Sequence, residues 1–91
     1  MRFLWNPAKA HVNLIQHGVS FEEATTVFGD LLSRTIPDPL HSEDEERSVL
    51  VGMSNRSNVL VVVHTERGDN IRIISARRAT RTERNKYEED L

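Results

Sequence analysis

Apolar and polar positions near the start of the chain follow a helical period. Asn6 can cap a helix N-terminus, and Pro7 suits the first helical turn because its missing N–H has no helical partner there. Gly18 is a typical helix stop, so a first helix is predicted over residues 7–17. The positions predicted to be buried are Ala8, Val12 and Ile15. The positions predicted to share a second, polar face are Lys9, Asn13 and His17.

A second helix is predicted over residues 21–29. Ser20 and Glu23 have the spacing of a capping box, and Val19 and Ala24 occupy the flanking apolar positions. The side chains expected to face the core are Phe21, Ala24, Val27 and Phe28.

After residue 46 the period changes to two, which is typical of strands. Strands are predicted at 34–36, 47–54, 59–65 and 71–76. Turns at 55–58 and 67–70 connect the last three strands into an antiparallel meander, with the nearly all-apolar strand 59–65 at its centre. Pro37 and Pro39 end the first strand, and an exposed acidic loop is expected to follow it as far as residue 45. Thr80 and Glu83 form another capping box, so a polar last helix is predicted over 81–90.

These elements predict an α+β fold: two N-terminal helices packed on a small antiparallel sheet, followed by a C-terminal helix. With 91 residues the chain is expected to form one domain, 1–91. Its longest apolar run, 59–63, is far too short for a membrane span, and the N-terminus lacks the pattern of a signal peptide. We therefore expect a cytoplasmic protein without a membrane partner. The absence of cysteine excludes disulfides, thiolate catalysis and Cys-type zinc sites.

Charge is strongly segregated along the chain. Residues 38–46 contain five acids and no Lys or Arg, whereas residues 67–86 contain seven basic residues and two acids. Arginine outnumbers lysine ten to two. Because guanidinium grips phosphate in a planar, two-pronged geometry, this bias favours a phosphate-bearing partner such as RNA. A merely solvated basic face is the other interpretation.

Several chemistries find no support. His11 and His17 are six residues apart and point about 240° apart on a helix, so they do not form a paired metal site. The sequence also lacks a nucleophile-elbow motif and a phosphate-binding glycine loop. We expect neither a metal nor another cofactor.

Metal-free RNA cleavage suits the residues that are present. It requires activation of the 2′-OH, positive charge on the phosphorane and protonation of the leaving 5′-oxygen. Arg67 follows the second meander strand, and Arg77 and Arg78 follow the third. His17 supplies an imidazole, a group suited to proton transfer, and Tyr87 supplies a hydroxyl.

Structural interpretations of the same residues stay open. His17 could simply favour the helix dipole, and Lys9 could be a solvated helix residue. Tyr87 could dock the last helix, and Arg72 could be a sheet-surface or partner-contact residue. Glu46 could pair with Arg47 or with a later arginine.

A family resemblance covers essentially the whole chain. The motifs that carry it include Phe3-x-Trp5, Lys9-x-x-x-Asn13, His17-Gly18-Val19-Ser20-Phe21-Glu22, Glu46-Arg47, Thr65-Glu66-Arg67, Ile71-Arg72-Ile73-Ile74-Ser75-Ala76-Arg77, Glu83 and Tyr87. With these motifs the sequence resembles the BrnT family, the toxins of BrnT/BrnA type II toxin-antitoxin pairs. It departs from the usual family pattern at Asn6, Gln16 and His64.

The resemblance implies a RelE-like fold and a metal-independent ribonuclease that stops translation and growth when it is unopposed. It also implies neutralisation by a BrnA-like ribbon-helix-helix antitoxin in a 2:2 complex, which binds operator DNA through the antitoxin and represses its own operon. The family's basic motif positions fall on Lys9, His17, Arg67 and Arg77, with Glu46, Glu83 and Tyr87 as accompanying positions.

The combined prediction assigns three groups of site residues. The predicted catalytic residues are Arg67, Arg77, His17, Lys9 and Tyr87. The predicted RNA-binding residues are Arg78, Arg81 and Asn13, and the supporting residues are Glu46 and Glu83. In the leading hypothesis Arg67 and Arg77 together bind the scissile phosphate. The alternative is a non-catalytic module that binds the antitoxin and acts in transcriptional control.

Overall fold

A computed structural model describes residues 1–38 and 47–89. Its elements, in chain order, are β1 (Arg2–Leu4), α1 (Pro7–His17), α2 (Phe21–Thr26), the 3-10 turn η1 (Val27–Gly29), β2 (Arg34–Pro37), β3 (Arg47–Met53), β4 (Val59–Arg67), β5 (Asn70–Arg78) and α3 (Arg81–Glu89). The predicted α+β class is confirmed. The second helix is shorter than predicted, because its last three residues tighten into η1.

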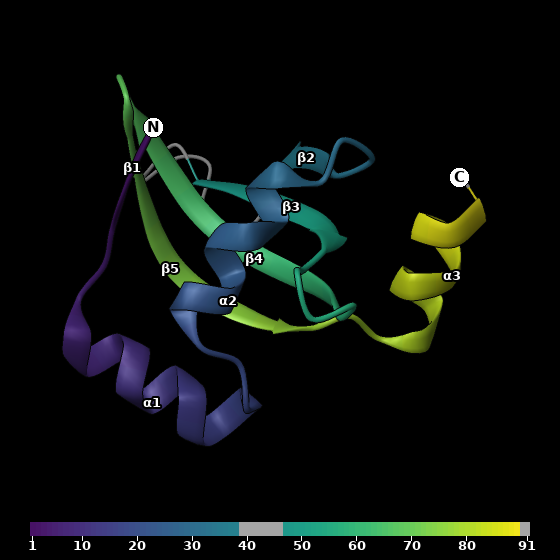
Figure 1. Ribbon diagram of the computed structural model, residues 1–91, viewed down its shortest axis with the longest axis horizontal. Coiled ribbons are helices and arrows are strands. Elements are labelled where there is room, and N and C mark those ends of the chain that lie inside the picture. The colour runs from purple at the N-terminus through teal and green to yellow at the C-terminus, as the bar shows by residue number, and fades with distance from the viewer. Residues whose placement is uncertain (39–46, 90–91) are drawn as a thin grey trace.

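The five strands form one sheet in the order β1-β5-β4-β3-β2. The antiparallel meander β3-β4-β5 and the central position of β4 match the predictions. The sheet as a whole is mixed, however, because β1 pairs in parallel with β5, and this corrects the expectation of a purely antiparallel sheet. Strand β1 has only three residues, which is too short to show an alternation of apolar and polar positions, so the sequence pattern does not predict it. Figure 1 shows α1 and α3 at opposite ends of the molecule, with the sheet between them.

The main core lies between the sheet and the segment formed by α2 and η1. We call the sheet face that carries this core the inner face and the opposite one the outer face. Buried side chains from the helical side are Val19, Phe21, Ala24 and Val27. Their partners on the sheet are Leu50, Leu60, Val62, Ile71, Ile73 and Ala76. Gly52 lets η1 and the turn after it approach closely, because a Cβ there would lie 2.9 Å from Cγ1 of Val27 and 2.7 Å from the Cβ of Ser33.

Helix α1 is oriented differently from the prediction. Val12 and Ile15, predicted to be buried, are 49% and 71% exposed, and Ala8 is also exposed. The buried residue is Asn13, whose side-chain amide donates to the carbonyls of Val19 (3.0 Å) and Ala76 (2.8 Å). Its Oδ1 accepts the Ala76 N–H at 3.1 Å. A polar clamp on the β5 backbone, rather than an apolar stripe, therefore fixes α1.

All three predicted capping residues, Asn6, Ser20 and Thr80, are present at the helix starts. Ser20 Oγ accepts the Glu23 N–H at 3.0 Å, but the Glu23 carboxylate turns away and accepts from Ser54 Oγ (2.6 Å) and Asn58 Nδ2 (2.9 Å). In α3 the reciprocal box is complete, since Thr80 Oγ1 accepts the Glu83 N–H and Glu83 Oε1 accepts the Thr80 N–H. Glu23 thus ties α2 to the β3–β4 turn instead of closing its own helix.

The predicted acidic loop lies mainly outside the described residues. Asp38, its first acid, is buried rather than exposed, and its N–H donates to the Arg47 carbonyl at 3.0 Å. Glu46 lies outside the described residues, so its predicted supporting role has no structural description.

Candidate active site

A β-bulge in β5 decides which residues of this strand share a face. His64 pairs with Ile73 and Val63 pairs with Ser75, so Ile74 is an extra residue without a partner on β4. Because strand side chains alternate, one inserted residue reverses the alternation beyond it. Ile73 therefore faces the inner core, and Ala76 does so too, although the two are three positions apart in the strand.

Ser75 and Arg77 consequently point to the outer face. Each lies opposite an outer-face residue of β4, Val63 and Val61 respectively. Without the bulge, regular alternation from Ile73 would turn Arg77 inward. The doublet Ile73-Ile74, two apolar residues in succession, is the sequence signal of this irregularity.

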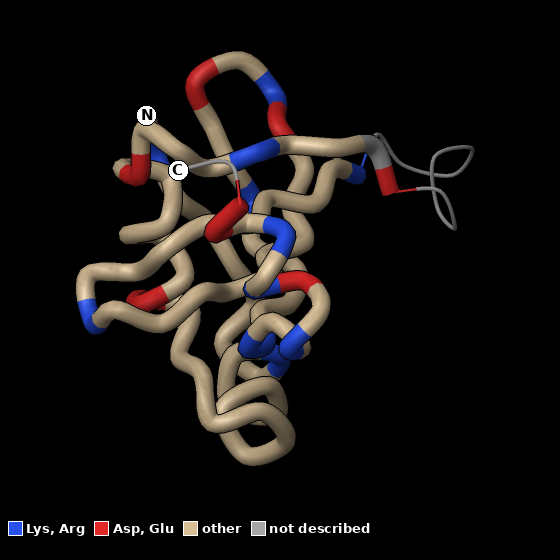
Figure 2. Tube along the Cα trace, turned by 90° about the vertical axis from the view of Figure 1, so that its right-hand side faces the viewer, with Lys and Arg blue, Asp and Glu red and all other residues tan. Residues whose placement is uncertain are grey.

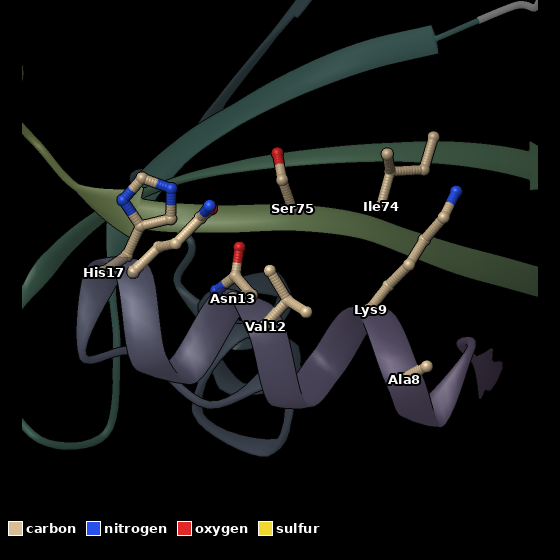
Figure 3. A pocket seen from close by; sticks show the side chains of 8 residues that line it. Ala8, Lys9, Val12, Asn13, His17, Ile74 and Ser75 are labelled. Atoms are coloured by element: carbon tan, nitrogen blue, oxygen red, sulfur yellow. The ribbon is translucent and has the colours of Figure 1, made fainter.

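A groove of about 390 Å³ lies between α1 and β5 on the outer side. Its lining residues are Ala8, Lys9, Val12, Asn13, Gln16, His17, Ile74 and Ser75. Figure 3 shows Lys9 and His17 rising from α1 toward β5, with Lys9 beside Ile74. Both side chains belong to exposed residues. The groove thus unites two of the predicted catalytic residues, Lys9 and His17, on one surface.

His17 occupies the last position of α1, immediately before Gly18. Gly18 adopts a left-handed conformation (φ 68°) and its N–H donates to the Leu14 carbonyl at 2.8 Å, which ends the helix and fixes the position of His17. His17 lies one helical turn, about 6 Å, beyond Asn13, the residue bonded to Ala76. Arg77 directly follows Ala76 in β5, but it is not one of the residues that line the groove.

Arg77 forms a two-pronged ion pair with Glu83. Its Nη1 and Nη2 donate to the two carboxylate oxygens of Glu83 at 2.7 and 3.0 Å. The hydrogen bonds from Arg77, with help from the Thr80 N–H, outweigh burial and lower the pKa of Glu83 to about 2. The same contact raises the pKa of Arg77. Glu83 therefore orients the guanidinium while compensating part of its charge.

Basic positions gather where β5 runs into α3, as the blue segments of Figure 2 show. They come from the end of β5 and the first turns of α3: Arg77, Arg78, Arg81 and Arg84. Arg81 is exposed, as an RNA contact requires. Arg78 lies opposite Leu60 and therefore faces the inner side. The pKa of Glu23 is lowered there against the effect of burial, first by the hydrogen bonds from Ser54 and Asn58 and then by the charges of Arg56 and Arg78. The consecutive residues Arg77 and Arg78 thus point to opposite faces of the sheet.

The structure separates Arg67 from Arg77. Arg77 lies opposite Val61, and Arg67 stands six residues further along β4, at about 3.3 Å per residue. The two arginines share the outer face but are about 20 Å apart along the strand. The hypothesis that they clamp one phosphate together is therefore wrong for this arrangement, because Arg77 also turns toward Glu83.

Two further predicted site residues have structural positions. Asn13 is only 6% exposed and its amide is used in the clamp on β5, so it does not offer the predicted RNA contact. Tyr87 is 5% exposed and its hydroxyl donates to Asp30 at 2.5 Å, which is the helix-docking alternative rather than a position in the groove. Burial and the contact with Asp30 raise the pKa of Tyr87 to about 12.

Ser75 also lines the groove, although no motif in the sequence marks it as a site residue. Its hydroxyl-bearing side chain lies between the Lys9 and His17 ends of the groove in Figure 3. Across residues 1–38 and 47–89 no group of three or more His, Asp or Glu side chains is arranged to hold a metal ion. No helix in this part of the chain is long and apolar enough to cross a membrane.

The fold and the groove together define a small α+β protein with a cationic site at the end of a strand, suited to phosphate groups. A family model described as "Ribonuclease toxin, BrnT, of type II toxin-antitoxin system" matches residues 5–83. The chain therefore belongs to the BrnT family of ribonuclease toxins, which confirms the resemblance found in its motifs.

A solved structure supports this fold. The crystal structure of the Brucella abortus ribonuclease toxin, BrnT, superposes with a TM-score of 0.69 at 21% sequence identity. The match covers 89% of this chain and 99% of the Brucella chain. No curated protein matches the sequence.

Proposed function

We propose that this chain cleaves RNA in the groove between α1 and β5, and that the reaction needs no metal ion. The observation that carries the proposal is the bulge at Ile74, which turns Ser75 and Arg77 to the side of the sheet where Lys9 and His17 line the groove. Bulges are found next to active sites, where they redirect side chains in this way. We also propose that the fold is RelE-like, as the family resemblance implies.

Each residue has a distinct task in the reaction. The 2′-OH of the substrate attacks the adjacent phosphorus, and the bond to the 5′-oxygen breaks, which leaves a 2′,3′-cyclic phosphate and a free 5′-hydroxyl. His17 accepts the proton of the 2′-OH and delivers it to the departing 5′-oxygen, since imidazole can act both as a general base and as a general acid. Arg77 stabilises the negative charge of the phosphorane, and Lys9 binds the neighbouring phosphate. Glu83 is a positioning residue that orients Arg77.

The chain carries a matched control for His17. His11 lies on the same helix and is exposed, but it does not line the groove. His17→Ala is expected to lower kcat/KM for RNA cleavage by about 100-fold or more. His11→Ala should cleave like the wild type. Equal activity of the two variants would exclude His17 from proton transfer.

We further propose that a BrnA-like ribbon-helix-helix antitoxin covers this protein in a 2:2 complex in the cytoplasm. Support comes from large apolar side chains that stay exposed in the described residues, among them Val12, Ile15, Leu31 and Ile36. The free toxin would arrest translation and growth. Co-expression with the antitoxin should restore growth and yield a complex of heterotetrameric mass, and operator DNA should shift only with that complex.

A further inference from the structure

A second cationic hollow lies on the outer face, at the end of the sheet opposite to Arg77. It has a volume of about 170 Å³ and is lined by Leu4, Thr65, Arg67, Asn70 and Arg72. Strands β1, β4 and β5 all contribute to it. The hollow is distinct from the groove beside α1, since the two share no lining residue.

The strand register brings two arginines of the hollow together. Thr65 lies directly opposite Arg72, and Arg67 follows two residues later on the same face of β4. Arg67 and Arg72 are therefore diagonal neighbours on adjacent strands, with about 7–8 Å between their positions. At this separation both long side chains can reach one anion, with the Thr65 hydroxyl and the Asn70 amide as further donors.

None of the ion pairs in the described part of the chain involves either arginine of this pair. Arg67 and Arg72 are both exposed, and neither forms an ion pair or a side-chain hydrogen bond with a residue that the structure describes. Arg77, by contrast, is held by Glu83. Two neighbouring like charges repel each other, and a bound anion would relieve this repulsion.

We propose that Arg67 and Arg72 bind a second backbone phosphate of the RNA strand whose scissile phosphate lies at Arg77. This inference rests on the proposed function and extends it. The hollow and Arg77 share the outer face and are about 20 Å apart, which corresponds to about six nucleotides of a stacked strand. A hollow of about 170 Å³ is large enough for a phosphate group. Arg67 is thereby a binding residue remote from the reacting atoms.

Arg72→Ala tests this subsite, with Arg56→Ala as a control of equal charge. Arg56 is exposed in the β3–β4 turn and does not line the hollow. The probe is a fluorescein-labelled, twelve-nucleotide 2′-O-methyl RNA, which cannot be cleaved because its 2′-oxygens are blocked. Arg72→Ala is expected to weaken binding about tenfold and to reduce the slope of log affinity against log salt by about 1, whereas Arg56→Ala keeps the wild-type values.

Cleavage kinetics separate binding from chemistry. Arg72→Ala should raise KM for a twelve-nucleotide RNA and leave kcat unchanged, and a dinucleotide substrate, too short to span both sites, should show no difference from the wild type. Wild-type affinity of Arg72→Ala for the probe would overturn the subsite, and so would an equal loss in Arg56→Ala. Unchanged RNA affinity with weaker antitoxin binding would assign the hollow to the protein partner instead. A wild-type chain that binds no RNA would overturn the proposed function itself, and this subsite with it.

Discussion

The Tyr87 hydroxyl donates a hydrogen bond of 2.5 Å to Asp30 Oδ2, the same oxygen that accepts the Met53 N–H at 2.8 Å. The other carboxylate oxygen, Oδ1, accepts the Leu32 N–H at 3.0 Å. Burial acts to raise the pKa of Asp30, but these donations outweigh it and lower the pKa. Asp30 thus joins η1, the edge of β3 and the C-terminal helix through one carboxylate.

Tyr87 is the one tyrosine in the sequence, so its ionisation can be followed directly. We expect the tyrosinate absorbance to appear with a midpoint near pH 12, because burial and Asp30 raise the pKa to about 12. Because the pKa is raised, the folded protein holds the phenol proton of Tyr87 more tightly than the unfolded chain does. The resulting contribution to the free energy of unfolding is complete below the ordinary pKa of about 10 and is lost as the pH rises through 12. A midpoint near 10 would contradict the docking of α3 through Tyr87.

Asn13→Ala is expected to destabilise the protein by about 2–4 kcal/mol. The substitution leaves the N–H and carbonyl of Ala76 and the carbonyl of Val19 without their partner in a buried environment. Equilibrium urea unfolding measures the change. The control is His11→Ala, an exposed position of the same helix, which should change the stability by less than about 0.5 kcal/mol. Similar stabilities of the two variants would argue against the clamp.

Glu83→Gln should make the protein less sensitive to acid. The pKa of Glu83 is lowered to about 2, so the stability that its charge contributes is complete above the ordinary value of 4.5 and is lost as the pH falls toward 2. The difference in unfolding free energy between wild type and variant should therefore shrink across this range. Its size stays modest because water reaches both partners. Glu88→Gln, in an exposed pair with Arg84, is the control, and a difference independent of pH would refute the assignment.

His64→Phe is expected to stabilise the protein by about 1–2 kcal/mol. The imidazole is fully buried and neither nitrogen has a hydrogen-bond partner among the described residues, which is costly; Nε2 lies 3.5 Å from Glu66 Oε1. A phenyl ring can keep the edge contact with Phe28, whose centroid lies 4.9 Å from that of His64. Thermal unfolding at neutral pH measures the gain. A lower midpoint for the variant would show that a polar interaction of His64 outweighs its burial.

Most of the fold could be predicted from the sequence, because local signals and tertiary packing agree over most of the chain. The caps at Asn6, Ser20 and Thr80 and the alternation of the meander marked the elements correctly. The burial of α1 could not be read in the same way. Asn13 pairs with a backbone 63 residues away, and only the folded sheet provides that partner. An apolar stripe at Val12 and Ile15 consequently pointed to the wrong face.

The candidate site was predictable in its residue types but not in its grouping. Lys9 and His17 line the same groove because they are eight residues apart on α1, and this spacing places two side chains on one face of any helix. The separation of Arg67 from Arg77 depends on the register between β4 and β5, and the outward direction of Arg77 depends on the bulge at Ile74. Tyr87 resembles a catalytic hydroxyl in sequence, and only the position of Asp30 gives it a structural role.

Cleavage of purified RNA in the presence of EDTA tests the central claim most directly. The wild type and Arg84→Ala, which loses an exposed arginine of the same basic region, are predicted to cleave RNA equally with and without EDTA. Arg77→Ala is predicted to lose cleavage by about 100-fold or more while keeping the circular dichroism spectrum of the wild type. Intact RNA in every reaction, cleavage abolished by EDTA, or full activity of Arg77→Ala would contradict a metal-free ribonuclease site at Arg77.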